Sequence, residues 1–142
     1  MIDGITNAGD LPVLERLMQF SARRQTLISG NIANISTPGY RPVDVSVEGF
    51  QHQLASAIDA RRERGGDGPL GIASSSTVEL TPGGMTLHPQ PSGDQLLFHD
   101  GNDRDLERIM QDLVGNFLTY RTASELIRNR FDMLETAIRE RV

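Results

Sequence analysis

The stretch Asn31-Ile32-Ala33-Asn34-Ile35-Ser36-Thr37-Pro38-Gly39-Tyr40 marks where an N-terminal helical pattern ends. Pro38 lacks an N–H and disfavours the α region for Thr37, so we expect the helix to stop near Ser36. The Pro-Gly pair then suits a type II turn, in which proline fixes φ at the first central position and Gly39 supplies the positive φ at the second. The stretch therefore predicts a helix end followed by a tight turn.

Three polar side chains flank this turn. Tyr40 can lay its ring over the helix end while its hydroxyl stays in water. Asn31 and Asn34 are poor helix formers at helix-interior spacing. We therefore expect their amides to bond to loop backbone or to a neighbouring chain.

The pattern before the turn predicts a helix over residues 11–36. Asp10 suits its N-cap and Pro12 its first turn. Arg23 and Arg24 lie in the weaker middle of the pattern, and we expect both in solvent, as charged side chains usually are. The apolar side of the helix carries Leu14, Leu17, Met18, Ile28, Ile32 and Ile35.

A second helix is predicted over residues 105–141. Its apolar residues step by three and four in near-regular alternation, which is an a/d-type seam suited to a coiled coil. At 1.5 Å per residue this helix is roughly 54 Å long, and the N-terminal helix covers at most about two-thirds of it. Part of its face is therefore left for other chains. The seam residues are Leu106, Ile109, Leu113, Phe117, Tyr120, Ser124, Ile127, Phe131, Leu134 and Ile138.

Gly115 lies inside this second helix, where glycine costs about 1 kcal/mol relative to alanine. Either the helix tolerates it, or another helix approaches closely at that point.

The middle segment, residues 37–99, is predicted to be rich in turns and loops and only weakly β. Alternation at 43–47 is strand-like, and residues 50–58 suggest a short helix. The composition of residues 65–69 is that of a flexible linker. Over residues 70–91 we expect a loop or a weak hairpin, with at most brief β pieces at 78–80 and 85–87, ordered mainly by neighbouring chains. The fold class is thus mainly α, with long terminal helices packing as a coiled coil in one domain, residues 1–142.

Composition limits the possible functions of the 142 residues. Apolar residues make up 37% and aromatic residues 5%, which suits helices that finish burying their faces against partners. The net charge of −5 is scattered, which argues against a nucleic-acid ligand. The absence of cysteine removes disulfides and thiolate chemistry, and no stretch approaches the about 20 apolar residues of a membrane span.

Candidate catalytic and metal-binding residues are weak. The histidines, His52, His88 and His99, lack the i, i+4 spacing of a zinc motif, so a surface role is expected. The glycine-rich pieces lack the Gly-Lys-Ser/Thr of a phosphate loop, and the serines lack a G-x-S-x-G context. Carboxylates such as Glu79 would need a cleft that this segment does not promise. We expect no enzyme activity, no cofactor, no metal and no small-molecule substrate.

The run N-I-A-N-x-x-T-P-G-Y resembles the N-terminal motif of the flagellar axial proteins, which are the rod, hook and hook-associated subunits. The residues that carry it are Asn31, Ala33, Asn34, Thr37, Pro38, Gly39 and Tyr40. A second run, D-G-N-D-R-D-L-E at 100–107, is similar to the opening of the C-terminal helix in short rod subunits of this family. Asn116 and Tyr120 match the N-x-x-x-Y step that follows it. The short length also suits a rod subunit, because hook and distal-rod proteins carry larger inserted domains.

The resemblance implies a structural subunit of the basal-body rod that crosses the periplasm and transmits torque from the motor to hook and filament. The implied partners are further copies of itself, neighbouring rod proteins, the junction protein between the rod base and the MS ring, and the flagellar type III export apparatus. Export without a cleaved signal peptide is expected, since the first ten residues lack a basic and an apolar region. The expected assembly interface comprises Leu14, Leu17, Ile28, Ile32, Ile35, Leu113, Phe117, Tyr120, Ile127, Phe131, Leu134 and Ile138.

Two alternatives stay open. One is another short axial rod subunit. The other is a soluble coiled-coil adaptor or export regulator that shares the helical ends but never enters a filament.

Overall fold

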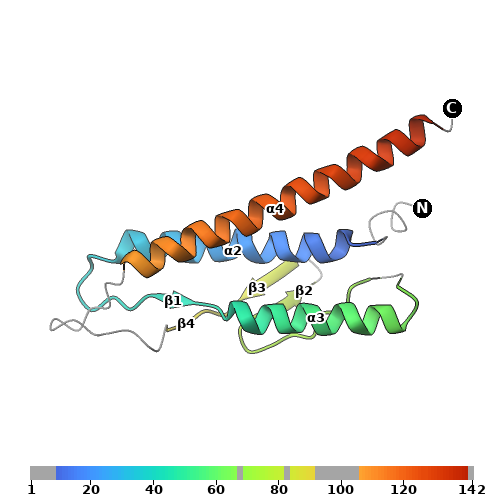
Figure 1. Cartoon of the computed structure of the whole chain (residues 1–142). Coiled ribbons are helices and arrows are strands. Elements are labelled where there is room, and N and C mark those ends of the chain that lie inside the picture. The colour runs from blue at the N-terminus through green and yellow to red at the C-terminus, as the bar shows by residue number, and fades with distance from the viewer. Residues whose placement is uncertain (1–8, 67–68, 82–83, 92–105, 141–142) are drawn as a thin grey trace.

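The computed structural model describes residues 9–66, 69–81, 84–91 and 106–140. It is mainly helical, as predicted, with two long helices running side by side: α2 (Leu11–Asn34) and α4 (Leu106–Arg139). The two are antiparallel, because contacts from successive turns of α2 reach progressively earlier residues of α4. α4 diverges from α2 toward its C-terminus (Figure 1).

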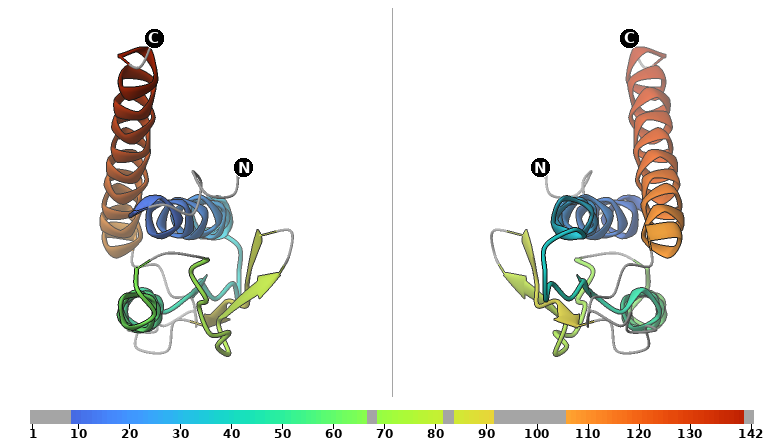
Figure 2. Two further views of the ribbon diagram at one scale, coloured as in Figure 1. Left: turned by 90° about the vertical axis from the view of Figure 1, so that its right-hand side faces the viewer. Right: turned by 90° about the vertical axis from the view of Figure 1, so that its left-hand side faces the viewer.

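The middle segment forms a third helix and four short strands. They are β1 (Val43–Asp44), α3 (Val47–Glu63), β2 (Val78–Thr81), β3 (Gly84–Leu87) and β4 (Gln90–Pro91). β2 and β3 form an antiparallel hairpin, and β1 pairs antiparallel with β4. α4 and the β2–β3 hairpin lie on opposite sides of α2, and α3 lies beneath it (Figure 2).

The turn after α2 is as predicted. The helix ends at Asn34, two residues before the expected position, and the Tyr40 N–H donates to the Thr37 carbonyl at 3.1 Å. Gly39 has φ of 74°, the positive value that the second central position of a type II turn requires. Asp10 is the N-cap, but its side chain makes no capping hydrogen bond. Its carboxylate instead pairs with Arg130 of α4 at 2.8 Å.

The hydrophobic core lies between α2, α3 and the segment that contains the hairpin. Its centre is a stacked pair, Phe20 of α2 and Phe50 of α3, with ring centroids 4.0 Å apart. Among the described residues, α4 contributes nothing to this buried cluster. The cluster consists of Phe20, Val45, Phe50, Leu54, Ala57, Leu70, Ile72, Val78 and Met85.

The strand expected over 43–47 is too long. It covers only Val43 and Asp44, and Val47 opens α3. Ser46 causes the change, because its hydroxyl accepts a hydrogen bond from the Gly49 N–H at 2.9 Å and caps the helix. α3 is then longer than expected, with 17 residues. Its end uses Gly66, at φ of 83°, whose N–H donates to the Arg61 carbonyl at 3.0 Å.

The expectation that residues 70–91 are ordered mainly by neighbouring chains is wrong. The two predicted β pieces form the β2–β3 hairpin, and Val78 and Met85 within it are 1% and 0% exposed. Leu70 and Ile72 are buried in the same core. This segment therefore packs against its own chain. In the part of the chain that the structure describes, no helix is long and apolar enough to cross a membrane.

Because the core excludes α4, two phenylalanines of the chain should differ sharply in their contribution to stability. Phe50→Ala removes a fully buried ring and should lower the free energy of unfolding by about 3–5 kcal/mol. The matched control Phe131→Ala truncates a ring that is 49% exposed and should change it by less than about 0.5 kcal/mol. Urea denaturation followed by circular dichroism measures both, and equal losses would contradict the position of the core.

Candidate functional site

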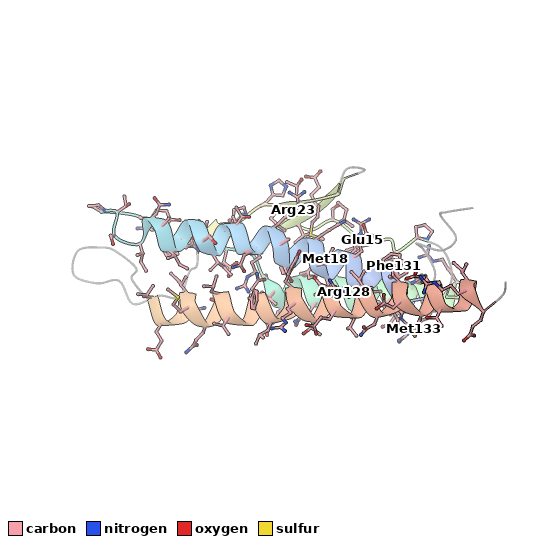
Figure 3. All side chains as sticks on the ribbon, turned by 90° about the horizontal axis from the view of Figure 1, so that it is seen from above. Glu15, Met18, Arg23, Arg128, Phe131 and Met133 are labelled. Atoms are coloured by element: carbon pink, nitrogen blue, oxygen red, sulfur yellow. The ribbon has the colours of Figure 1, made fainter. Side chains whose placement is uncertain are left out.

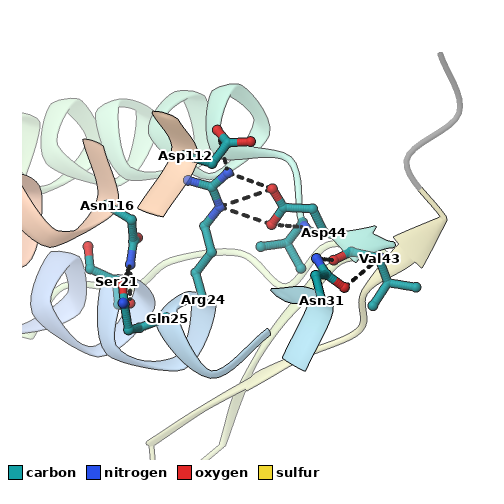
Figure 4. Close-up of polar contacts among 9 residues, drawn as sticks. Ser21, Arg24, Gln25, Asn31, Val43, Asp44, Asp112 and Asn116 are labelled. Carbon is teal, nitrogen blue, oxygen red and sulfur yellow. Dashed lines mark hydrogen bonds and ion pairs between the residues drawn. The ribbon is translucent and has the colours of Figure 1, made fainter. Parts of the chain in front are cut away.

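The predicted family motif forms a hydrogen-bonded junction between the end of α2 and β1. Asn31 is 3% exposed, and both the nitrogen and the oxygen of its side-chain amide bond to the backbone of Val43. The Asn31 Nδ2 donates to the Val43 carbonyl at 2.8 Å, and Oδ1 accepts from the Val43 N–H at 3.1 Å (Figure 4). Asn31 thus bonds to backbone outside its helix, as predicted, although the partner lies in the short strand β1 and not in a loop.

Two other parts of that prediction are wrong. The Tyr40 hydroxyl is not simply in water, because it donates to Asn31 Oδ1 at 2.9 Å. The Asn34 amide donates to the Gly30 carbonyl at 2.8 Å and so bonds within its own helix. The remaining motif residues, Ala33, Thr37, Pro38 and Gly39, lie exposed around the turn.

A buried arginine ties α2 to two other elements. Arg24 is 7% exposed, which contradicts the expectation that it lies in solvent, whereas Arg23 is exposed. The Arg24 guanidinium donates to both carboxylate oxygens of Asp44 in β1, at 2.5 to 3.2 Å, and to Asp112 of α4 at 3.2 Å (Figure 4). Burial lowers the pKa of Arg24, but the two carboxylates more than offset it, so the pKa is raised and the group stays charged.

The sequence held a signal for these buried polar residues that the prediction missed. They lie on the buried side of α2, in one row with its apolar residues, and successive members of this row are four and three residues apart in turn. Polar side chains at such positions are buried and need partners. The residues of this row are Leu17, Ser21, Arg24, Ile28, Asn31 and Ile35.

α4 faces α2 with a column of residues spaced by seven, which we name the α2-facing column. Ile109, Asn116 and Ala123 are 5%, 5% and 1% exposed, and Arg130 reaches Asp10 at the start of α2. Asn116 Nδ2 donates to the Ser21 carbonyl at 2.9 Å and to Gln25 Oε1 at 2.8 Å (Figure 4).

The two terminal helices pack together as predicted, but the buried column is rotated by one position from the predicted seam. Asn116 and Ala123 are buried, while the neighbouring Phe117 is 51% exposed. Of the predicted seam, Ile109 is buried, and Leu113, Ser124 and Ile127 are half-buried. The Ser124 hydroxyl donates to Met18 Sδ at 3.5 Å, and Met18 lies between the two helices in Figure 3. In the same view Glu15 and Arg23 point away from α4.

The large apolar residues of α4 remain exposed. α2 is about 36 Å long and α4 about 51 Å, so α4 extends beyond the start of α2. From residue 131 to residue 140 every residue is exposed. Predicted interface residues with large exposed fractions are Phe117 at 51%, Tyr120 at 39%, Phe131 at 49%, Leu134 at 36% and Ile138 at 64%.

The other predicted interface residues are less accessible. Ile28 is 2% exposed, so its contacts lie within the chain. Leu14, Leu17, Ile32, Ile35, Leu113 and Ile127 are half-buried. Leu14 also lines a groove of about 640 Å³ between α2, α3 and α4, together with Val13, Ile58, Leu126 and Met133. A Cβ added at Gly115 would have nothing within 4 Å, so among the described residues no other helix makes a close approach there.

The described residues hold no group of three or more His, Asp or Glu side chains that could bind a metal ion. His52 and His88 are exposed, and His88 Nε2 lies 3.1 Å from Glu79 Oε2. His99 and residues 100–105 of the predicted 100–107 run lie outside the described residues. The last two residues of the run, Leu106 and Glu107, begin α4. What the described residues do offer is packing surface, in the large exposed apolar side chains of α4.

The chain is similar to bacterial flagellar rod proteins over most of its length. It is 25% identical to the flagellar basal body rod protein FlgB of Bacillus subtilis over 131 residues, which cover 92% of this chain and 94% of that protein. The FlgB proteins of Yersinia enterocolitica and Salmonella typhimurium are each 29% identical, over 80% and 75% of this chain and 82% and 75% of their own length. The chain is a relative of the FlgB rod proteins. No family model matches it.

The resemblance to the FlgB type of rod protein is thus confirmed across most of the chain. The alignments with these FlgB proteins cover 75% to 92% of this chain, so the similarity does not depend on one short motif.

The Asn31 junction gives a test with an internal control. Asn31→Ala leaves the Val43 N–H and carbonyl without their partner and should lower the free energy of unfolding by about 1–3 kcal/mol. Asn34→Ala removes one exposed hydrogen bond within α2 and should cost less than about 0.5 kcal/mol. Urea titration measures both values, and amide exchange at Val43 should accelerate only in Asn31→Ala.

Proposed function

We propose that this chain is a structural subunit of the flagellar basal-body rod, of the proximal, FlgB type. The observation that supports this most directly is the similarity to FlgB proteins over 92% of this chain and 94% of the Bacillus protein. It covers both terminal helices and the segment between them, which is what a shared architecture requires.

The mechanism we propose is assembly through the terminal helices. The exposed apolar side chains of α4, with Phe131, Leu134 and Ile138 on the projecting end, would be covered by neighbouring subunits. A contiguous exposed apolar surface of this kind is typical of an interaction site. In this proposal the interlocked helices form a stiff shaft that transmits torque from the membrane-embedded motor to hook and filament.

The proposed partners follow from that position. They are further copies of this chain, neighbouring rod proteins, the junction protein at the MS ring, and the type III export apparatus. We further propose that export to the periplasm uses that apparatus without a cleaved signal peptide. A chain without cysteine can cross into an oxidising compartment without forming disulfides.

A second candidate is a soluble coiled-coil adaptor or export regulator. The observation that favours it is the core formed by α2, α3 and the hairpin within a single chain. Such a core suits a protein that is folded and monodisperse alone.

The experiment that separates the two is a gene deletion complemented by epitope-tagged protein, followed by purification of basal bodies. Tag in the rod fraction, with a non-motile deletion strain, is the expected result. Tag confined to the cytoplasm, with intact rods in the deletion strain, would favour the adaptor.

The projecting end of α4 gives a sharper prediction. Phe131→Asp should abolish swimming while leaving secretion of the protein intact, because a charge cannot be buried in an apolar contact without a partner. Thr136→Asp introduces the same charge on the opposite side of α4 and should leave swimming largely unchanged. Motility in soft agar and a blot of the secreted fraction measure the two effects. Normal swimming of the Phe131→Asp strain would remove this residue from the interface.

A further inference from the structure

The contact between α2 and α4 is unusual in what it buries. The α2-facing column contains two apolar residues, Ile109 and Ala123, with the buried polar Asn116 between them and the exposed, charged Arg130 at its end. The α2 residues that meet it include Ser21 and Gln25, both polar. Apolar burial therefore provides little of the specificity of this contact.

Two further sets of α4 residues, mainly apolar, also repeat every seven positions. One set is Leu113, Tyr120, Ile127 and Leu134, and the other is Phe117, Ser124, Phe131 and Ile138. If α4 slid along α2 by seven residues, each set would still present a mainly apolar row, although the sizes of single side chains would change, as where Phe117 takes the place of Ser124. A strict heptad pattern specifies which face packs but does not by itself specify the register.

We propose that Asn116 is a positioning residue that sets the register of α4 against α2. Its amide is 5% exposed and donates to both the Ser21 carbonyl and Gln25 Oε1. A slide of α4 breaks both hydrogen bonds and leaves a buried amide without a partner, which is costly. A single buried asparagine is known to fix register in helical pairs at some cost in stability.

The two directions of sliding are opposed by different residues. Moving α4 one way brings Arg130 into the place of Ala123, which is 1% exposed and has room for a methyl group. A charged side chain without a partner blocks that movement. Moving α4 the other way brings Asn116 into the place of Ala123 and Ile109 into the place of Asn116. Asn116 opposes this second movement together with the ion pair between Arg24 and Asp112, whose carboxylate is 40% exposed.

Replacing Asn116 by alanine therefore removes one of the two restraints on the second movement and none of those on the first. The new side chain fits the place of Ala123, and Ile109 fills the place that Asn116 leaves. α4 then projects further beyond α2 by about 10.5 Å, the rise of seven helical residues. This register is a property of the single chain and does not depend on rod assembly.

Because the chain has no cysteine, engineered cysteine pairs can report the register directly. Met18→Cys with Ser124→Cys reports the observed register, since the Ser124 hydroxyl lies 3.5 Å from Met18 Sδ. Met18→Cys with Phe117→Cys reports the shifted register, because residue 117 then takes the place of residue 124. Oxidation of dilute monomer, followed by digestion and mass spectrometry, gives the yield of each intramolecular disulfide.

In the otherwise unchanged chain we expect the 18–124 disulfide and little of the 18–117 disulfide. Adding Asn116→Ala should raise the 18–117 yield about tenfold, with helix content by circular dichroism unchanged. The control Asn129→Ala removes the same amide from an exposed position on α4 and should leave both yields unchanged.

Three results would overturn the assignment. An unchanged 18–117 yield in Asn116→Ala would show that other residues fix the register. Loss of both disulfides would show that Asn116 holds α4 on α2 without selecting its register. An equal rise in Asn129→Ala would show a general weakening of α4. These outcomes concern the isolated chain, so they stay distinguishable from any failure to enter the rod.

Discussion

The ion pair network of Arg24 constrains the arrangement of the whole chain. A guanidinium that is 7% exposed must be paired, because an isolated buried charge is far too costly. Its partners come from β1 and from α4, so the network fixes α2 relative to the strand segment on one side and to the second long helix on the other. Asp44 provides two of its oxygens and is 25% exposed, whereas Asp112 provides one and is 40% exposed. The attachment of α2 to the middle segment is therefore the firmer of the two.

Asn31 strengthens the same side of the molecule. It lies two turns after Arg24 and binds Val43, the residue next to Asp44. α2 is thus joined to β1 by two polar junctions and to α3 by the stacked pair of Phe20 and Phe50. α4, by contrast, meets α2 mainly through polar and small side chains, and Ile109 and Ala123 are its buried apolar residues. Two levels of attachment follow: an N-terminal unit with its own core, and a long helix fixed to it by position-specific contacts.

The sequence predicted the helices and the turn well because each had a strong local cause. Pro38 and Gly39 enforce the end of α2, and sustained apolar spacing defines α4. The prediction failed where a residue acts through a distant partner. Arg24 is predicted in solvent because charged side chains usually are, and although its position on α2 signals burial, nothing near it in sequence identifies Asp44 or Asp112 as its partners. Val47 was read as part of a strand because the capping role of Ser46 depends on the direction that the chain takes afterwards. The predicted seam of α4 is one position away from the buried column, because a pattern of large apolar residues defines the prediction. The positions that pack closely against α2 are instead Asn116 and Ala123, which are polar or small.

That last difference has a physical consequence for a chain that packs with others. Had Phe117 and Phe131 been buried against α2, α4 would have lost both of its phenylalanine rings from the apolar surface that it offers. By using small and polar residues inward, the chain keeps its largest apolar side chains outward, at 51% and 49% exposure for these two. Hydrophobic contacts are non-directional, so they fit many arrangements, whereas hydrogen bonds and ion pairs demand particular atoms at particular distances. Specificity within the chain and apolar surface outside it are therefore provided by different faces of one helix. The polar contacts between α4 and α2 therefore determine where the exposed apolar side chains of α4 lie.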